Sequence, residues 1–208
     1  MARATPAERL AGARALSERE PALARVVAAA GPPAIEQRPS TFATLARAIA
    51  YQQLSGKAAA TIWGRVKDLV GGREPEAEEL LARRPDSLRS AGLSTAKVAA
   101  VRDLAAHVRR RDIVPGSLHR LDDEQVVELL TRVRGIGRWS AQMHLIFSLG
   151  RLDIWPTGDL GVRKGYALWR GLAEMPTEKA LEPLGEVYRP FRTLAAWYAW
   201  RAIDLRLA

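Results

Sequence analysis

The stretch LDDEQVVELLTRVRGIGRWSAQMHLIFSLGRLDIWPTGDLGVRKGY, residues 121–166, largely decides the fold. Asp122 and Gln125 match the capping-box pattern that begins a helix, and apolar residues then recur at helical spacing as far as Val133. Two glycines, Gly135 and Gly137, interrupt this helix and favour a tight turn, because glycine adopts positive φ at little cost. The helix that follows is apolar on two faces, as buried helices are. The pattern predicts two helices joined by a glycine-rich hairpin, over about residues 122–149.

Such a hairpin presents backbone N–H groups at the N-terminus of its second helix, where phosphate oxygens are natural ligands. Arginines on both sides of the turn add positive charge, so the unit would hold a DNA backbone without reading bases. A glycine that ends one helix before another begins is also common in ordinary packing, and the hairpin alone leaves that alternative open. The predicted phosphate-binding residues are Arg134, Gly135, Ile136, Gly137, Arg138 and Trp139.

Three further segments give the hairpin a specific context. Asp159 lies 20 residues after Trp139 within WPTGDLG, residues 155–161, while YQQLS precedes the hairpin at 51–55 and YRPFR follows it at 188–192. With these segments the chain resembles the helix-hairpin-helix DNA glycosylases over about residues 42–198. Within that superfamily it is most similar to the alkylbase glycosylases of the 3-methyladenine DNA glycosylase II type.

The resemblance implies an all-α fold of two helical lobes with an active-site cleft between them. One lobe would comprise residues 42–151 and contain the hairpin, and the other would combine residues 1–41 with 152–208 and carry the catalytic loop. The sequence itself also favours an all-α fold, because the alternation of period two that marks strands does not persist anywhere. Near the N-terminus, Ser17 and Glu20 match a capping box and predict that a helix begins at Ser17.

The resemblance also assigns chemistry to Asp159. A glycosylase extracts a nucleotide from the helix and breaks its C1′–N bond. A carboxylate at a helix N-terminus is favoured in its ionised form, and it can stabilise a developing oxocarbenium sugar and orient water. The alternative is a simple N-cap, but the spacing from the hairpin favours the catalytic interpretation. Asp153 is the second choice.

A cationic alkylated base would bind against electron-rich ring faces by stacking and cation–π attraction. Each aromatic residue taken singly is more often part of a core than of a pocket. Leu54 resembles the wedge that fills the gap left by a flipped nucleotide; a core leucine is the alternative, and Gln53 or Ser55 could share the task. The predicted base-pocket residues are Tyr51, Met143, Trp139, Trp155 and Phe191.

Members of the superfamily that also cleave the strand carry a lysine nucleophile where this chain has Trp139, so we expect no lyase activity. The chain has no cysteine, which excludes the four-cysteine iron–sulfur cluster of the endonuclease III branch. No cofactor is expected to be required. The resemblance does imply a possible Na⁺ or K⁺ on the hairpin carbonyls, which match Thr131, Val133 and Ile136.

The net charge of +9 favours a polyanionic partner, although an arginine-rich composition is the alternative reason for it. We therefore expect a monofunctional base-excision-repair enzyme acting on double-stranded DNA with alkylated bases such as 3-methyladenine and 7-methylguanine. The alternatives are a glycosylase for deaminated or ethenylated bases and a non-catalytic helix-hairpin-helix DNA-binding protein. The sequence shows no membrane span or signal, so we expect an intracellular protein that is cytoplasmic and nucleoid-associated if it is bacterial. The resemblance implies a monomer, because two-lobed glycosylases need no second subunit to enclose a nucleotide.

Overall fold

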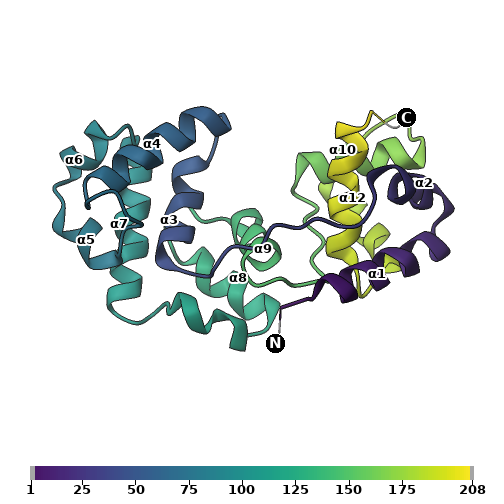
Figure 1. Cartoon of the computed structure of the whole chain (residues 1–208), viewed down its shortest axis with the longest axis horizontal. Helices are drawn as coiled ribbons and strands as arrows, with labels where there is room; N and C mark the ends of the chain where they lie inside the picture. Colours follow the sequence, from purple (N-terminus) through teal and green to yellow (C-terminus); the bar gives the residue numbers. More distant parts are fainter. Residues whose placement is uncertain (1–2, 207–208) are drawn as a thin grey trace. The chain divides into compact units, whose positions relative to one another are not determined.

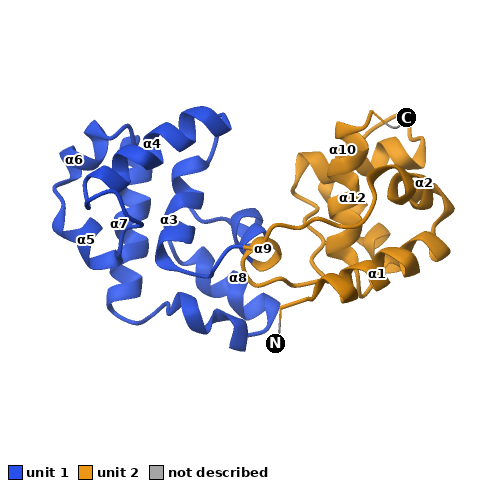
Figure 2. Cartoon of the chain, in the orientation of Figure 1, with its two compact units in different colours: residues 1, 38–144 blue, residues 2–37, 145–208 orange. Residues whose placement is uncertain are grey.

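The computed structural model describes residues 3–206, and the all-α prediction is confirmed because no strand occurs among them. The chain divides into two compact units (Figures 1 and 2). Among the described residues, 38–144 form the first unit, and 3–37 with 145–206 form the second. No helix among the described residues is long and apolar enough to cross a membrane.

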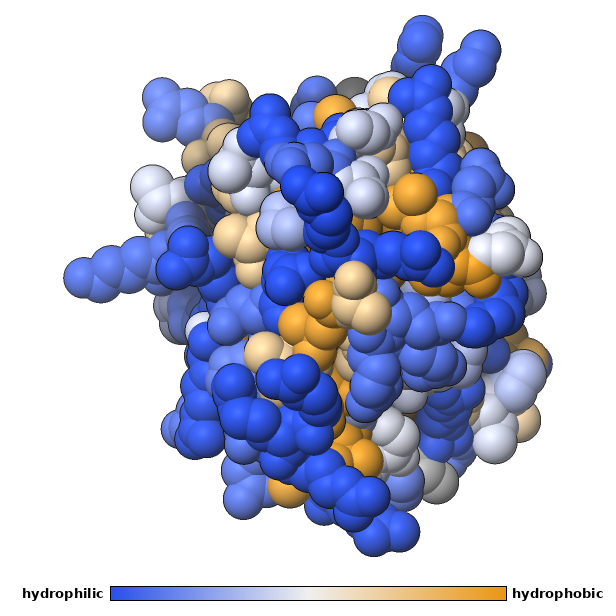
Figure 3. Space-filling model, turned by 90° about the vertical axis from the view of Figure 1, so that its left-hand side faces the viewer, coloured by the Kyte–Doolittle hydropathy of each residue, from blue (hydrophilic) through white to orange (hydrophobic). Residues whose placement is uncertain are grey.

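The first unit is organised around one long helix, α7 (Thr95–Arg109). Ser94 caps α7 by accepting the Lys97 amide, and Val98, Val101 and Leu104 form its buried face. The surface that includes α5 and α6 is largely hydrophilic, with narrow apolar strips between the polar side chains (Figure 3). The other elements are α3 (Phe42–Tyr51), α4 (Gly56–Asp68), α5 (Ala77–Ala82), α6 (Pro85–Ser90), η1 (Pro115–Arg120), α8 (Asp123–Thr131) and α9 (Arg138–Phe147), the last of which continues into the second unit.

The second unit is organised around α12 (Arg192–Asp204), where every residue from Thr193 to Ala199 is buried. Helix α10 (Leu160–Arg170) approaches it so closely that a Cβ on Gly165 would lie 1.9 Å from the Ala199 carbonyl oxygen. A glycine at this position is therefore required for the two helices to meet. The other elements are α1 (Pro6–Arg19), α2 (Pro21–Ala30), α11 (Glu178–Leu181) and η2 (Pro183–Tyr188).

The predicted helix start at Ser17 is wrong. Helix α1 continues through Ser17, whose hydroxyl donates to the Ala13 carbonyl at 3.0 Å. Glu20 instead caps α2 by accepting the Ala22 amide, and Pro21 occupies the first helical position, where its missing N–H costs nothing.

Candidate DNA-binding and catalytic site

The hairpin forms as its sequence predicts. The Asp122 carboxylate accepts the Gln125 amide at 2.8 Å, and the Gln125 side chain accepts the Asp122 amide at 3.0 Å, so the capping box is confirmed. Helix α8 ends at Thr131 and α9 begins at Arg138. Because the first amides of a helix point out of its end without an intrahelical acceptor, the N-terminus of α9 offers donors to an anion.

The two glycines of the turn have different reasons to be glycine. Gly135 has φ +78°, and a Cβ there would lie 3.1 Å from the Ala100 Cβ, so the fold itself requires glycine. Gly137 does not have positive φ, and apart from its neighbours in the chain no atom lies within 4 Å of the position that its Cβ would take. The open space beside Gly137 is what a closely approaching phosphate would need.

The structure contradicts the prediction for Ile136 and shows a competing partner for Arg138. The Ile136 amide donates to the Val133 carbonyl at 3.1 Å, and the Ile136 side chain is buried, so this residue holds the turn together and its amide is not turned toward a phosphate. Arg138 does not present an isolated charge, because its guanidinium forms two hydrogen bonds with the Glu124 carboxylate, at 2.7 and 3.0 Å. This hydrogen bonding lowers the pKa of Glu124. A phosphate would therefore compete with Glu124 for Arg138.

Substituting each glycine separates folding from DNA binding. We expect Gly135→Ala to destabilise the protein by about 1–2 kcal/mol, because alanine is unfavourable at positive φ. Gly137→Ala should change stability by less than about 1 kcal/mol and weaken binding to duplex DNA about tenfold, through displaced phosphate hydrogen bonds. Thermal unfolding and fluorescence anisotropy measure the two effects. Wild-type affinity in Gly137→Ala would rule out a phosphate beside this residue.

A cavity of about 580 Å³ lies in the first unit beside the hairpin. It brings together three of the predicted base-pocket residues, Tyr51, Trp139 and Met143, with Gln53 and Leu54 of the predicted wedge. The Trp139 side chain is 45% exposed, whereas the Tyr51 ring has the Arg47 guanidinium 4.0 Å from its centre. Arg47 thus occupies one face of Tyr51, and Trp139 offers the larger accessible ring surface. The cavity is lined by Ala48, Tyr51, Gln52, Gln53, Leu54, Trp139, Ser140 and Met143.

The segment between α3 and α4 distinguishes among the three wedge candidates. Gln52 has φ −53° and ψ 134°, Gln53 has φ +56°, and the Leu54 amide donates to the Tyr51 carbonyl at 3.3 Å, as in a type II turn. Ser55 is the N-cap of α4, so its hydroxyl is committed to the Ala58 amide. Leu54 is 40% exposed and lines the cavity, so its apolar side chain is the strongest of the three candidates.

Asp159 is held in the second unit by two donors. It caps α10, and its Oδ1 accepts the Val162 amide at 2.8 Å and the indole N–H of Trp200 at 2.9 Å. The Trp200 ring is stacked on Phe147, with centroids 5.8 Å apart. A Cβ on Gly161 would lie 2.8 Å from the Trp200 ring, so glycine makes room for the indole. The arrangement fixes the direction of the carboxylate, as a group acting on a positive centre requires.

Sequence reasoning missed Trp200. The residue lies 41 positions after Asp159, in a helix whose other aromatic residues, Trp197 and Tyr198, are buried in the core. Its partial exposure and its hydrogen bond to Asp159 distinguish it from them in the folded chain. The second carboxylate candidate, Asp153, is held by Arg192 at 2.8 and 3.0 Å and by Arg189 at 2.9 Å. These ion pairs give Asp153 a structural role.

Trp155 and Phe191 need reinterpretation, because each ring packs against residues of its own unit, the second. Trp155 is only 4% exposed, its indole N–H donates to the Leu181 carbonyl at 3.0 Å, and Gly185 abuts the ring edge. The Phe191 ring lies against α1, where a Cβ on Gly12 would be 2.7 Å from it. Both rings therefore pack within the second unit.

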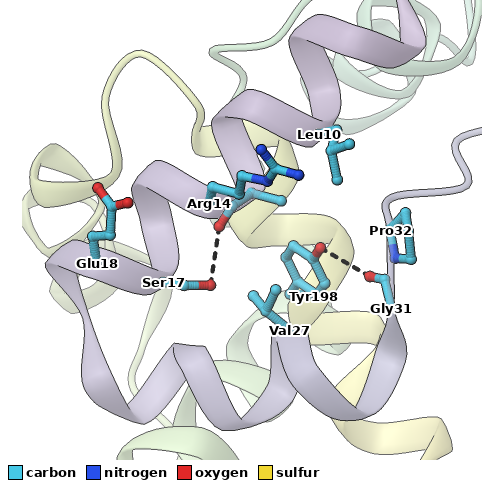
Figure 4. Close-up of a pocket in the computed structure, with 9 residues that line it drawn as sticks. Leu10, Arg14, Ser17, Glu18, Val27, Gly31, Pro32 and Tyr198 are labelled. Atoms are coloured by element: carbon cyan, nitrogen blue, oxygen red, sulfur yellow. Dashed lines mark hydrogen bonds between the residues drawn. The ribbon is translucent and has the colours of Figure 1, made fainter.

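A second cavity, of about 370 Å³, lies in the second unit beside α1 and α2 (Figure 4). Its lining includes aliphatic residues such as Leu10 and Val27 as well as Arg14 and Glu18, and the Tyr198 hydroxyl beside it donates to the Gly31 carbonyl at 3.0 Å. Burial raises the pKa of Tyr198 to about 12, so the hydroxyl stays protonated at neutral pH. Tyr198 is the only aromatic residue among the lining residues, and the cavity does not resemble a base-stacking site.

The hairpin, the glycine-rich loop and the capping aspartate match a known family. A family model described as "HhH-GPD superfamily base excision DNA repair protein" matches residues 46–190. The chain belongs to the HhH-GPD superfamily. The resemblance inferred from the motifs is therefore confirmed.

Relatives and solved structures of HhH-GPD proteins agree with this assignment. DNA-3-methyladenine glycosylase 1 of Schizosaccharomyces pombe is 36% identical over 172 residues, which are 81% of this chain and 75% of that protein. The solved structure of an S. pombe 3-methyladenine DNA glycosylase with abasic DNA has a TM-score of 0.85 at 34% identity, covering 95% of this chain and 98% of that one. A DNA-3-methyladenine glycosidase from Bacillus halodurans has a TM-score of 0.84 at 34% identity, covering 92% and 88%.

Proposed function

We propose that this HhH-GPD chain is a monofunctional DNA glycosylase of base excision repair. It would hydrolyse the N-glycosidic bond of alkylated bases, such as 3-methyladenine and 7-methylguanine, in duplex DNA and leave an abasic site. The observation that carries the proposal is that one unit combines the hairpin, the exposed Leu54 and an aromatic cavity. The names of the similar glycosylases support the substrate class.

The first unit would bind the DNA and the damaged base. The hairpin contacts the backbone, and Leu54 takes the place of the flipped nucleotide. The volume of about 580 Å³ lies within the range of about 300–1,000 Å³ that is usual for small-ligand pockets. The faces of Trp139 and Tyr51 attract a positively charged alkylated base by cation–π interaction.

Asp159 would supply the chemistry at the sugar. When the C1′–N bond breaks, its electron pair leaves with the base, and a cationic base departs as a neutral molecule without a strong general acid. The carboxylate stabilises the oxocarbenium ion that remains. A water molecule then bonds to C1′ and releases one proton, which the carboxylate can accept. These steps require neither a redox cofactor nor an iron–sulfur cluster.

An alkali test separates base removal from strand cleavage. Wild-type protein is incubated with an end-labelled duplex carrying one 7-methylguanine, and the strand is analysed with and without mild alkali. We expect cleavage only after alkali, because an abasic site is alkali-labile and Trp139 cannot form a Schiff base. Cleavage without alkali, together with a covalent protein–DNA adduct after borohydride reduction, would contradict the monofunctional assignment. An intact strand under both conditions would contradict glycosylase activity on this lesion.

We also propose that the carbonyls of Thr131, Val133 and Ile136 would hold a Na⁺ or K⁺ ion when DNA binds. Carbonyl oxygens suit these ions, and the Val133 oxygen, which accepts the Ile136 amide at 3.1 Å, keeps a second lone pair. We expect weaker DNA binding when K⁺ is replaced by tetramethylammonium at equal ionic strength. The same affinity in both salts would show that the hairpin binds no such ion.

A further inference from the structure

One face of α7 connects the Leu54 turn to the hairpin. Lys97, Ala100 and Asp103 recur at intervals of three residues, so they lie along the same side of the helix. Ala100 lies beside Gly135, where it leaves little room for a Cβ, and the Asp103 carboxylate accepts the Arg134 amide at 2.8 Å. Lys97 lies on the same face one turn earlier in α7, and it binds the Leu54 turn.

The Lys97 ammonium donates to two carbonyls where α3 ends, Ala50 at 2.9 Å and Gln52 at 2.7 Å. A cation at this point satisfies carbonyls that have no helical partner and complements the negative end of the helix dipole. The neighbouring Gln53 has φ +56°, a conformation that a non-glycine residue keeps only when its surroundings hold it there. Burial lowers the pKa of Lys97, so its binding site is partly withdrawn from water.

The Gln52 side chain makes the second connection. Its amide nitrogen donates to the Gly135 carbonyl at 2.9 Å and to the Ser140 hydroxyl at 3.3 Å. The residue directly before the Gln53–Leu54 pair is thus hydrogen-bonded to the hairpin turn and to the first turn of α9. Lys97 fixes the backbone of Gln52 while this side chain fixes its distance from the hairpin.

We propose that Lys97 and Gln52 are positioning residues for nucleotide flipping, which hold Leu54 at a fixed place relative to the phosphate-binding hairpin. Phosphate contact and insertion of Leu54 then occur as one step, because the two elements cannot move apart. This inference rests on the proposed function. It predicts that removing the Lys97 or Gln52 hydrogen bonds slows excision most for lesions whose extraction from the duplex costs the most free energy.

The test compares a paired lesion with an unpaired one. Lys97→Met, which keeps the aliphatic stem but removes the donors, should slow single-turnover excision from a paired duplex about tenfold or more, because flipping there costs the most. Excision of the same lesion from a single-base bulge should stay within about twofold of wild type, since little extraction is needed. Lys97→Gln, a milder change at the same position that keeps an amide donor, should show the same pattern with less slowing if Lys97→Met folds poorly.

Lys67→Met is the matched control, because Lys67 pairs with Glu74 at 3.7 Å and lies outside this network. The fluorescence of 2-aminopurine opposite the lesion, measured in the Asp159→Asn background, reports insertion of Leu54 without catalysis, and we expect a smaller increase with Lys97→Met. Equal slowing on both substrates, or no slowing on either, would overturn the inference. Failure of wild-type protein to act on either substrate would instead contradict the proposed function.

Discussion

Asp159→Asn is expected to slow base excision by about a thousandfold or more. The amide cannot stabilise the positive sugar or accept a proton from water, yet it keeps an oxygen that can accept the Val162 amide and the Trp200 indole. The fold should therefore be unchanged. The affinity for lesion-containing duplex should be equal to that of wild type or higher. Single-turnover excision from a methylated duplex and anisotropy of a labelled duplex measure the two quantities.

Asp153→Asn is the informative comparison, because it removes the charge of the competing carboxylate candidate. Its loss should lower thermal stability, since Arg192 would lose the shorter of its ion pairs and keep the one with Glu186 at 3.6 Å. Its excision rate at a temperature where the variant is folded should stay within about threefold of wild type. Wild-type excision by Asp159→Asn, with a large loss in Asp153→Asn, would reverse the assignment.

Trp200→Phe is expected to give the second-largest effect, a loss of about 10- to 100-fold in the excision rate. Phenylalanine keeps an aromatic ring beside Phe147 but removes the N–H that donates to Asp159 at 2.9 Å. A hydrogen bond to a charged group contributes about 1.5–3 kcal/mol, and here it also fixes the direction of the carboxylate. The rate of the chemical step should fall while binding of lesion-containing duplex changes little.

Trp197→Phe provides a control on the same helix. Trp197 is buried against Tyr198, with ring centroids 4.9 Å apart. Unlike Trp200, it does not donate a hydrogen bond to Asp159 in the described part of the chain. Its substitution should lower thermal stability and leave the excision rate of the folded protein near wild type. If Trp197→Phe and Trp200→Phe slow excision equally, the indole of Trp200 contributes only through packing.

Local features of this chain were predictable from sequence. The capping box at Asp122, the turn at Gly135 and the N-cap at Asp159 depend on residues within a few positions of one another, and all three form as expected. Ser17 is an instructive exception. Its pattern resembles a cap, but Pro21 places the helix boundary at Glu20.

Long-range contacts were not predictable from sequence. Gln52 is hydrogen-bonded to Gly135, 83 positions away, and Asp159 to Trp200, 41 positions away, so no local sequence pattern indicates either pair. The burial of Trp155 could not be predicted either, because this residue lies in the motif-bearing loop but faces the core of its unit. An aromatic residue in a catalytic motif can serve packing or binding, and only its tertiary neighbours distinguish the two.

The most direct test of the account is chromatography of the free bases that wild-type protein releases from methylated duplex DNA. We predict a peak of 3-methyladenine that grows with time, with the DNA strand left uncut before alkali. The peak should be absent with Asp159→Asn at the same enzyme concentration and incubation time. Tight binding of methylated duplex without release of any free base would contradict the assignment of this HhH-GPD chain as an alkylbase glycosylase.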